Sequence, residues 1–213
     1  MHLKLVTPIP KIHCVVAKNQ HLLASTFMRP QEFYESPYKG IRGKYFSREH
    51  YEDTYAKETG AFTYYQDWAG FNMPMECMKE FFETFHDLSK KEQKLYDLID
   101  PLFLNNFEYV IGVTKGDTRS LDHEIAHGLW YTNHKYKTAA SVLLSKLKNI
   151  KRLKKFLLRN GYETSKLDDE IQAYLSTSTW TYLKRKKMCD KKDARPFQRL
   201  FKKFTAEYNL SLS

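Results

Sequence analysis

The chain has 213 residues, of which 42% are hydrophobic and 15% aromatic, and it carries a formal charge of +10. Such a composition predicts a globular protein with a sizeable core. Because Lys4 and Lys11 interrupt the apolar N-terminus and no run of about 18 apolar residues follows, we expect neither a signal peptide nor a membrane span. The three cysteines are widely spaced and form no C-x-x-C pair, which argues against a disulfide framework and favours a reducing, cytoplasmic setting.

The N-terminal half predicts a small sheet accompanied by helices. Residues 3 to 7 and 12 to 17 predict short strands, the second suited to a buried position because it reads Ile-His-Cys-Val-Val-Ala. Residues 21 to 60 predict helices in pieces. Residues 62 to 74 crowd five aromatic side chains into a short stretch, which favours packing over the lining of a substrate cleft.

A strand followed by a helix is predicted in the middle of the chain. Residues 107 to 113 are rich in β-branched and aromatic side chains, which is typical of a strand. The next residues form a turn in which Asp117 or Thr118 can cap a helix. Apolar residues then recur at helical spacing, at Leu121, Ile125 and Leu129. The run D-H-E-I-A-H-G at residues 122 to 128 therefore lies on a predicted amphipathic helix.

The spacing of the two histidines in this run indicates metal chemistry. On a helix, His123 and His127 lie on one face about a turn apart, where both can bind a single zinc ion. Glu124 then projects beside the metal and can take a proton from a zinc-bound water, which is the chemistry of a metal-dependent hydrolase. Asp122 could orient an imidazole or be a solvated helix charge.

The strand, turn and helix of residues 107 to 134 resemble those of the zincin metallopeptidases. The resemblance implies a zinc peptidase in which an edge strand before the active-site helix pairs with an extended substrate. The metzincin branch would need glycine at 130 and histidine at 133, whereas this chain has Trp130 and Asn133, and His134 is one residue out of register. The gluzincin branch, whose third ligand is a glutamate on a later helix, agrees better with this sequence.

The later run L-D-D-E-I-Q-A-Y looks similar to the gluzincin glutamate helix, and the resemblance makes Glu170 the third ligand. Asp169 and His134 are the alternatives. Thr164 or Ser165 can cap this helix, so that Glu170 is expected about two turns into it and rigidly held. An acidic helix start exposed to water is the competing interpretation of these carboxylates.

A donor for the developing oxyanion is also needed in such a site. Tyr174 lies at i+4 from Glu170 and would share its face, so its phenol is one candidate catalytic group. His134 and Tyr131 are two others that the sequence cannot rank.

Positive charge is concentrated in the C-terminal part of the chain. Residues 1 to 134 hold 15 basic and 18 acidic side chains, whereas residues 135 to 213 hold 20 and 7. Clustered lysine and arginine are typical of surfaces that bind nucleic acid or anionic membranes, and also of solvated helix faces. A third interpretation is that the basic lobe steers an acidic protein substrate toward the site.

The C-terminal part predicts helices throughout. Residues 138 to 159 predict one long amphipathic helix that ends at Gly161. The basic cluster at residues 184 to 187 is expected to close the helix of Glu170, and residues 195 to 208 to form the last helix.

Together these features predict an α+β protein: a small N-terminal mixed or antiparallel sheet with helices, an edge strand leading into the H-E-x-x-H helix, and a helical C-terminal lobe. We expect a single domain over residues 1 to 213 with lobes at 1 to 134 and 135 to 213. The leading function is a zinc-dependent peptidase. The alternatives are a deformylase-like zinc amidohydrolase with Cys77 as a ligand, and a noncatalytic basic module that binds nucleic acid or protein.

Overall fold

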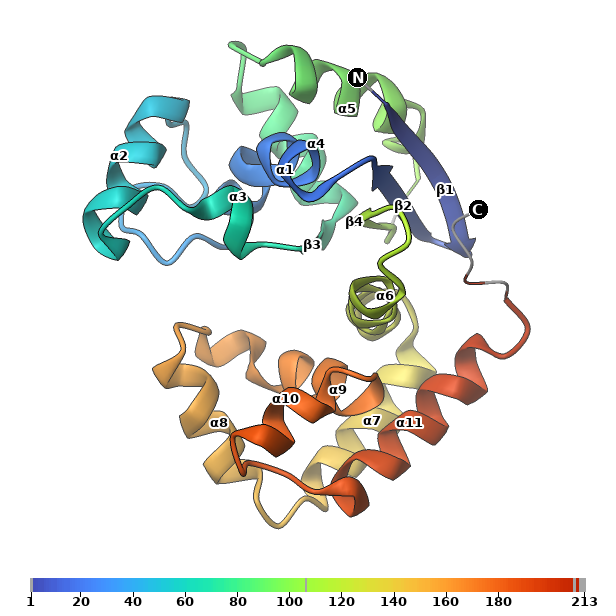
Figure 1. Cartoon of the computed structure of the whole chain (residues 1–213). Helices are drawn as coiled ribbons and strands as arrows, with labels where there is room; N and C mark the ends of the chain where they lie inside the picture. The colour runs from blue at the N-terminus through green and yellow to red at the C-terminus, as the bar shows by residue number, and fades with distance from the viewer. Residues whose placement is uncertain (1, 106, 209, 211–213) are drawn as a thin grey trace. The chain divides into compact units, whose positions relative to one another are not determined.

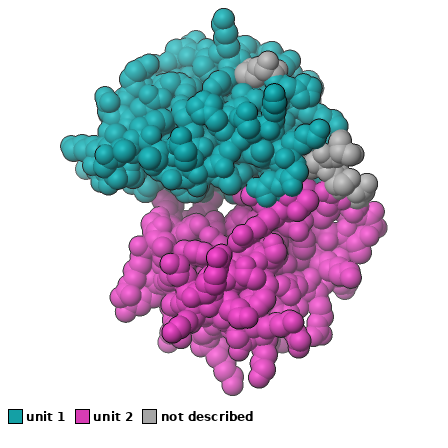
Figure 2. Space-filling view, in the orientation of Figure 1, with its two compact units in different colours: residues 1–117, 212 teal, residues 118–211, 213 magenta. Residues whose placement is uncertain are grey.

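A computed structural model describes residues 2–105, 107–208 and 210 of the chain (Figure 1). The described residues divide into two compact units, unit 1 within residues 2–117 and unit 2 within residues 118–210 (Figure 2). The boundary therefore lies before the H-E-x-x-H helix and not at residue 134, because this helix packs against later helices of unit 2. In the part of the chain that the structure describes, no helix is both long and apolar enough to cross a membrane.

Unit 1 contains a mixed four-stranded sheet with the strand order β1-β2-β4-β3. Its strands are β1 (Leu3–Ile9), β2 (Ile12–Ala17), β3 (Gly70–Pro74) and β4 (Tyr109–Thr114). β2 pairs with β1 antiparallel and with β4 parallel, and β3 pairs with β4 antiparallel. The predicted strands at 3 to 7, 12 to 17 and 107 to 113 are thus confirmed with small shifts at their ends.

The strand that leads into the H-E-x-x-H helix is internal, so the expectation of an edge strand at this place was wrong. β4 is paired along both sides, and the edges of the sheet are β1 and β3. Tyr109 to Val113 are buried without alternation, which means that both faces of β4 are covered. An apolar run predicts that a strand is buried, but it does not predict which strands become its neighbours.

Helices of unit 1 cover the sheet and build its core. α1, α4 and α5 contact the strands. Phe27 and Leu23 of α1 lie so close to β4 that a Cβ on Gly112 would come within 2.9 Å of the Phe27 ring. The aromatic segment at 62 to 74 packs into this core, with Tyr64 and Phe71 fully buried. The helices are α1 (Gln20–Glu35), α2 (Arg48–Thr59), α3 (Tyr64–Asp67), α4 (Met75–Thr84), α5 (Lys90–Ile99) and the 3-10 turn η1 (Asp100–Leu102).

Unit 2 contains helices and no strand among its described residues. Its elements are α6 (Thr118–Thr132), α7 (His134–Ser145), α8 (Ile150–Arg159), the 3-10 turn η2 (Thr164–Lys166), α9 (Leu167–Ser176), α10 (Trp180–Arg185) and α11 (Lys191–Thr205). They share an apolar core that includes Leu144, Leu153, Leu157, Ile171, Leu175 and Phe197.

Three helix predictions in unit 2 need correction. The single helix expected at 138 to 159 is two helices, α7 and α8, separated by residues 146–149. The basic cluster at 184 to 187 closes α10, since the helix of Glu170 already ends at Ser176. The last helix starts earlier than expected, because Asp190 forms a capping box with Asp193 at its N-terminus.

Candidate metal centre

α6 carries the two histidines of the motif and is held in place by its apolar face. Leu121, Ile125 and Leu129 are at most 2% exposed, as the helical spacing predicts. His123 and His127 lie on the opposite face of the helix, and their ring centroids lie 4.9 Å apart at an interplanar angle of 88°. The two imidazoles therefore lie one turn apart on one side of α6.

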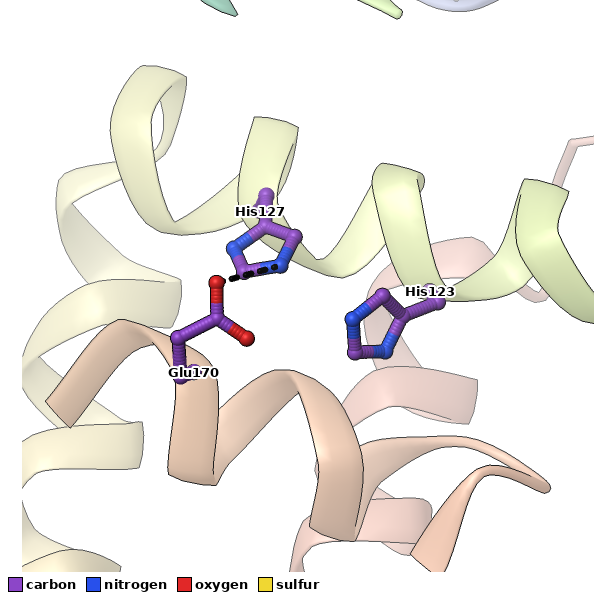
Figure 3. A group of neighbouring side chains, drawn as sticks. All are labelled: His123, His127 and Glu170. Carbon is purple, nitrogen blue, oxygen red and sulfur yellow. Dashed lines mark ion pairs between the residues drawn. The ribbon is translucent and has the colours of Figure 1, made fainter. Parts of the chain in front are cut away.

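α9 brings a carboxylate to these imidazoles (Figure 3). Glu170 Oε1 lies 3.7 Å from His127 Nε2, and one ligand atom from each of His123, His127 and Glu170 lies within 4.8 Å of the other two. A tetrahedral ion with bonds of about 2.1 Å separates its ligand atoms by about 3.4 Å, so small side-chain movements would complete such a shell. The three predicted ligands thus form a group that could hold a metal ion.

The local structure around Glu170 differs from the prediction. A 3-10 turn at Thr164–Lys166 precedes α9, and no side chain caps the helix. Glu170 consequently lies in the first turn of α9 instead of the second. Its position is nevertheless fixed, because α9 packs on α6 and Gln172 Nε2 donates a hydrogen bond of 3.1 Å to the carbonyl of Ala126. Carboxylates in a first helical turn are also stabilised by the helix dipole.

Asp169 lies behind His127 and does not belong to the three-residue group. Its Oδ1 lies 2.9 Å from His127 Nδ1, although the angle is poor for a hydrogen bond. The same Oδ1 accepts a hydrogen bond of 3.0 Å from Gln172 Nε2, and the Tyr136 hydroxyl donates one of 2.8 Å to Gln172 Oε1. A carboxylate on the far nitrogen of a metal-binding imidazole orients the ring, so this position suits an outer partner better than a ligand.

The ring of His123 is positioned by a chain of hydroxyl groups that leads back to α9. Its Nδ1 lies 3.2 Å from Thr179 Oγ1, which lies 2.7 Å from the hydroxyl of Thr177. Thr177 Oγ1 donates in turn to the carbonyl of Ala173 on α9 at 3.1 Å. Residues from α9 and from the turn after it therefore support both imidazoles of α6.

The electrostatics of the group favour positive charge at one imidazole. Burial by itself lowers the pKa of His127, but the neighbouring charges of Asp169 and Glu170 raise it to about 10. Burial lowers the pKa of His123, and the positive charge on His127 lowers it further. The carboxylates of Asp169 and Glu170 thus compensate the positive charge of a buried, protonated His127.

Glu124 and two tyrosines surround the same group. Glu124 is only 6% exposed, and its charge contributes to the raised pKa of His127 and of Tyr174. The Tyr174 ring lies 5.0 Å from the His123 ring, and its hydroxyl lies 3.1 Å from that of Tyr162. Burial raises the pKa of Tyr174 to about 12, so this phenol stays protonated and can donate. The sequence contains no signal for Tyr162, which follows the turn after α8.

The other candidates lie outside this group. His134 begins α7 and is exposed, because α6 ends at Thr132 and does not continue to it. Tyr131 is 38% exposed. Burial raises the pKa of Asp122, yet the described contact with an imidazole belongs to Asp169. Cys77 lies on α4 in unit 1 and joins no metal-ligand group among the described residues, so nothing supports the ligand set of a deformylase.

Comparisons of the chain with protein-family models, with curated proteins and with solved structures returned no match. These comparisons therefore show no family for the chain, and the structure adds the geometry of three side chains that could hold a metal ion. That geometry is local to α6 and α9, so it depends on the packing of unit 2 alone.

Proposed function

We propose that unit 2 is a zinc-dependent peptidase of the gluzincin type, with His123, His127 and Glu170 as its metal ligands. One observation carries the proposal: side chains 43 residues apart converge within 4.8 Å, and two of them belong to an H-E-x-x-H motif on a helix. Two imidazole nitrogens and one carboxylate oxygen are the ligands of a catalytic zinc that keeps one position open. The donor set therefore fits zinc.

The remaining residues of the site have roles that follow from their positions. A bound zinc would polarise the substrate carbonyl and lower the pKa of a coordinated water to about 7. The carboxylate of Glu124 would accept the proton of the attacking water and deliver it to the leaving amine. Tyr174, with Tyr162 beside it, can donate a hydrogen bond to the developing oxyanion. Asp169 would keep the His127 ring oriented.

Metal content and turnover of matched variants test this function. We expect one tightly bound zinc per purified chain, its loss in His123→Ala and Glu170→Ala, and its retention in Asp168→Asn, the control from the same turn of α9. Glu124→Gln should retain zinc but lose hydrolysis by a factor of about 100 or more. Cleavage-site profiling of a denatured protein mixture would detect the activity without a known substrate.

Three outcomes would contradict the proposal. Full zinc affinity in Glu170→Ala would mean that the third ligand is elsewhere in the chain. A zinc-loaded wild type that produces no cleavage beyond that of Glu124→Gln would remove the peptidase function and leave a metal-binding module. Hydrolysis of small formyl amides, but not of peptides, would instead favour the amidohydrolase alternative.

A further inference from the structure

Unit 2 carries a basic surface built from α8 and from the end of α10. We define this basic surface by its seven exposed cations: Lys151, Arg152 and Lys155 on α8, with Lys184, Arg185, Lys186 and Lys187 at the end of α10. No acidic residue occurs at positions 148–162 or 176–189. The cations are therefore not interleaved with negative charge along the chain.

Hydrogen bonds and ring packing connect α8 with α10 and with the residues that follow it (Figure 1). Arg152 donates to the carbonyl of Lys187, and Asn149 Nδ2 donates to the carbonyl of Met188 at 2.7 Å. Further along, the ring centroids of Phe156 and Tyr182 lie 6.2 Å apart. Tertiary packing thus combines two short basic clusters into one surface.

The positive charge of this surface is not compensated by the carboxylates nearest to it. Among the residues that the structure describes, the ion pair recorded for α8 is that of Lys154 with Asp168, at 2.8 Å, and Lys154 is not one of the seven. Asp190 and Asp193 cap the N-terminus of α11, and among the described residues neither forms an ion pair with one of the seven cations. Like charges gathered without counter-charges raise the local positive potential and attract anionic partners.

A row of aromatic rings connects the basic surface with the candidate metal centre. The Tyr174 ring lies 5.0 Å from that of His123, and the Tyr182 ring is stacked on Tyr174 at 5.8 Å and 27°. Lys186 Nζ lies over the Tyr182 ring at 5.8 Å from its centroid. The row spans at most about 17 Å, a distance that about five residues of extended polypeptide cover.

We propose that the basic surface binds an acidic segment of the polypeptide substrate, within about five residues of the bond to be cleaved. The inference rests on the proposed peptidase function of the adjacent metal centre. Glutamate or aspartate side chains of an extended chain would contact Lys186 and its neighbours while the Tyr174 and Tyr182 rings lie along the backbone. The preference is then a property of this chain's own residues, and it separates acidic substrates from neutral ones.

The aromatic side chains of this surface favour a polypeptide over a nucleic acid. Proteins that bind single strands expose ring faces on which bases stack. Here Lys184 Nζ lies over the Trp180 ring at 5.5 Å and Lys186 over Tyr182, so the lysines occupy ring faces that bases would need. Both aromatic side chains are also only partly exposed.

Binding to an inactive variant tests the proposal without requiring turnover. The protein is the zinc-loaded full chain with Glu124→Gln, and fluorescence anisotropy follows labelled probes at about 50 mM salt, where charge is weakly screened. The probes are a peptide of about ten residues alternating glutamate and glycine, its glutamine counterpart, and an oligouridylate of equal charge. Lys151→Glu with Lys155→Glu perturbs the basic surface, and Lys202→Glu with Lys203→Glu on α11 is the control of equal charge change.

We expect the affinity for the glutamate peptide to be at least about tenfold higher than that for its glutamine counterpart. The double change on α8 should remove most of this difference, whereas the α11 control should retain it. Equal affinity for the two peptides would overturn the proposal, as would equal loss in the control. Tighter binding of the oligouridylate, with displacement of the acidic peptide, would assign the surface to nucleic acid. If the wild type binds the acidic peptide but cleaves at sites that show no enrichment of nearby acidic residues, the substrate preference alone is refuted. If the wild type cleaves nothing, the result counts against the peptidase function.

Discussion

Replacing Glu32 by glutamine should stabilise unit 1 at neutral and alkaline pH. Glu32 lies on α1, only 6% exposed, and its Oε2 has no hydrogen-bond partner in the structure. Burial raises the pKa of this carboxyl from 4.5 to about 7, even though the nearby hydroxyls of Ser36, Tyr51 and Tyr64 lower it in part. The ionised form is therefore disfavoured by folding.

The magnitude and the sign follow from linkage. Below pH 4.5 the carboxyl is protonated in both the folded and the unfolded chain, and its burial carries no ionisation cost. Between pH 4.5 and about 7 the unfolded chain ionises first, so the free energy of unfolding falls by about 1.4 kcal/mol per pH unit. Above the folded pKa the loss is constant at about 3 kcal/mol. Glutamine has the same shape and cannot ionise, so Glu32→Gln should avoid this loss.

Urea unfolding between about pH 4.5 and about pH 8 provides the assay. Fluorescence of Trp68 reports on unit 1 in a background of Trp130→Phe and Trp180→Phe. The variant should exceed the parent by up to about 3 kcal/mol at the alkaline end and match it at the acid end. Glu58→Gln, at an exposed position of α2, is the matched control and should change little at either pH. A Glu32→Gln effect that is the same at both ends of the range would refute the reasoning.

Three further predictions concern the metal centre and the sheet. Asp169→Asn should weaken zinc binding by about 10 to 100-fold because the carboxylate no longer orients His127, whereas the control Asp168→Asn should leave zinc affinity unchanged. Competition with a metal-sensitive dye measures both affinities, and equal affinities would exclude the orienting role. The free energy of unfolding of unit 2 should be about 4 kcal/mol lower after zinc is removed with a chelator than in the presence of free zinc at about 1,000 times the dissociation constant of the site. An unchanged melting curve would mean that no site of this affinity exists. Gly112→Ala should destabilise unit 1 by about 1 to 3 kcal/mol in urea unfolding because the added Cβ would meet the Phe27 ring. Phe27→Leu in the same chain should recover part of this loss. An unchanged free energy of unfolding in Gly112→Ala would show that α1 can shift.

Local sequence patterns predict most strands and many helices of this protein because they report on nearby residues. The run at residues 12 to 17 is apolar and β-branched, and it forms β2. The expected helix at 138 to 159 shows where such patterns fail. Its leucines continue at helical spacing through the break at 146–149, because α7 and α8 bury their apolar sides in the same core. The side chain of Asn149, which donates to the carbonyl of Met188, marks the break only once the fold is known.

Residue spacing alone predicts that His123, Glu124 and His127 lie on one amphipathic helix, since the positions of residues within a helix follow from its geometry. The internal position of β4 in the sheet becomes visible only in the folded protein. The same is true of the approach of Glu170 to the imidazoles and of the position of Asp169 behind one of them. These neighbours are contributed by segments far apart along the chain. Their contacts depend on how the sheet pairs and how α9 packs on α6, which no periodicity of a single segment can specify.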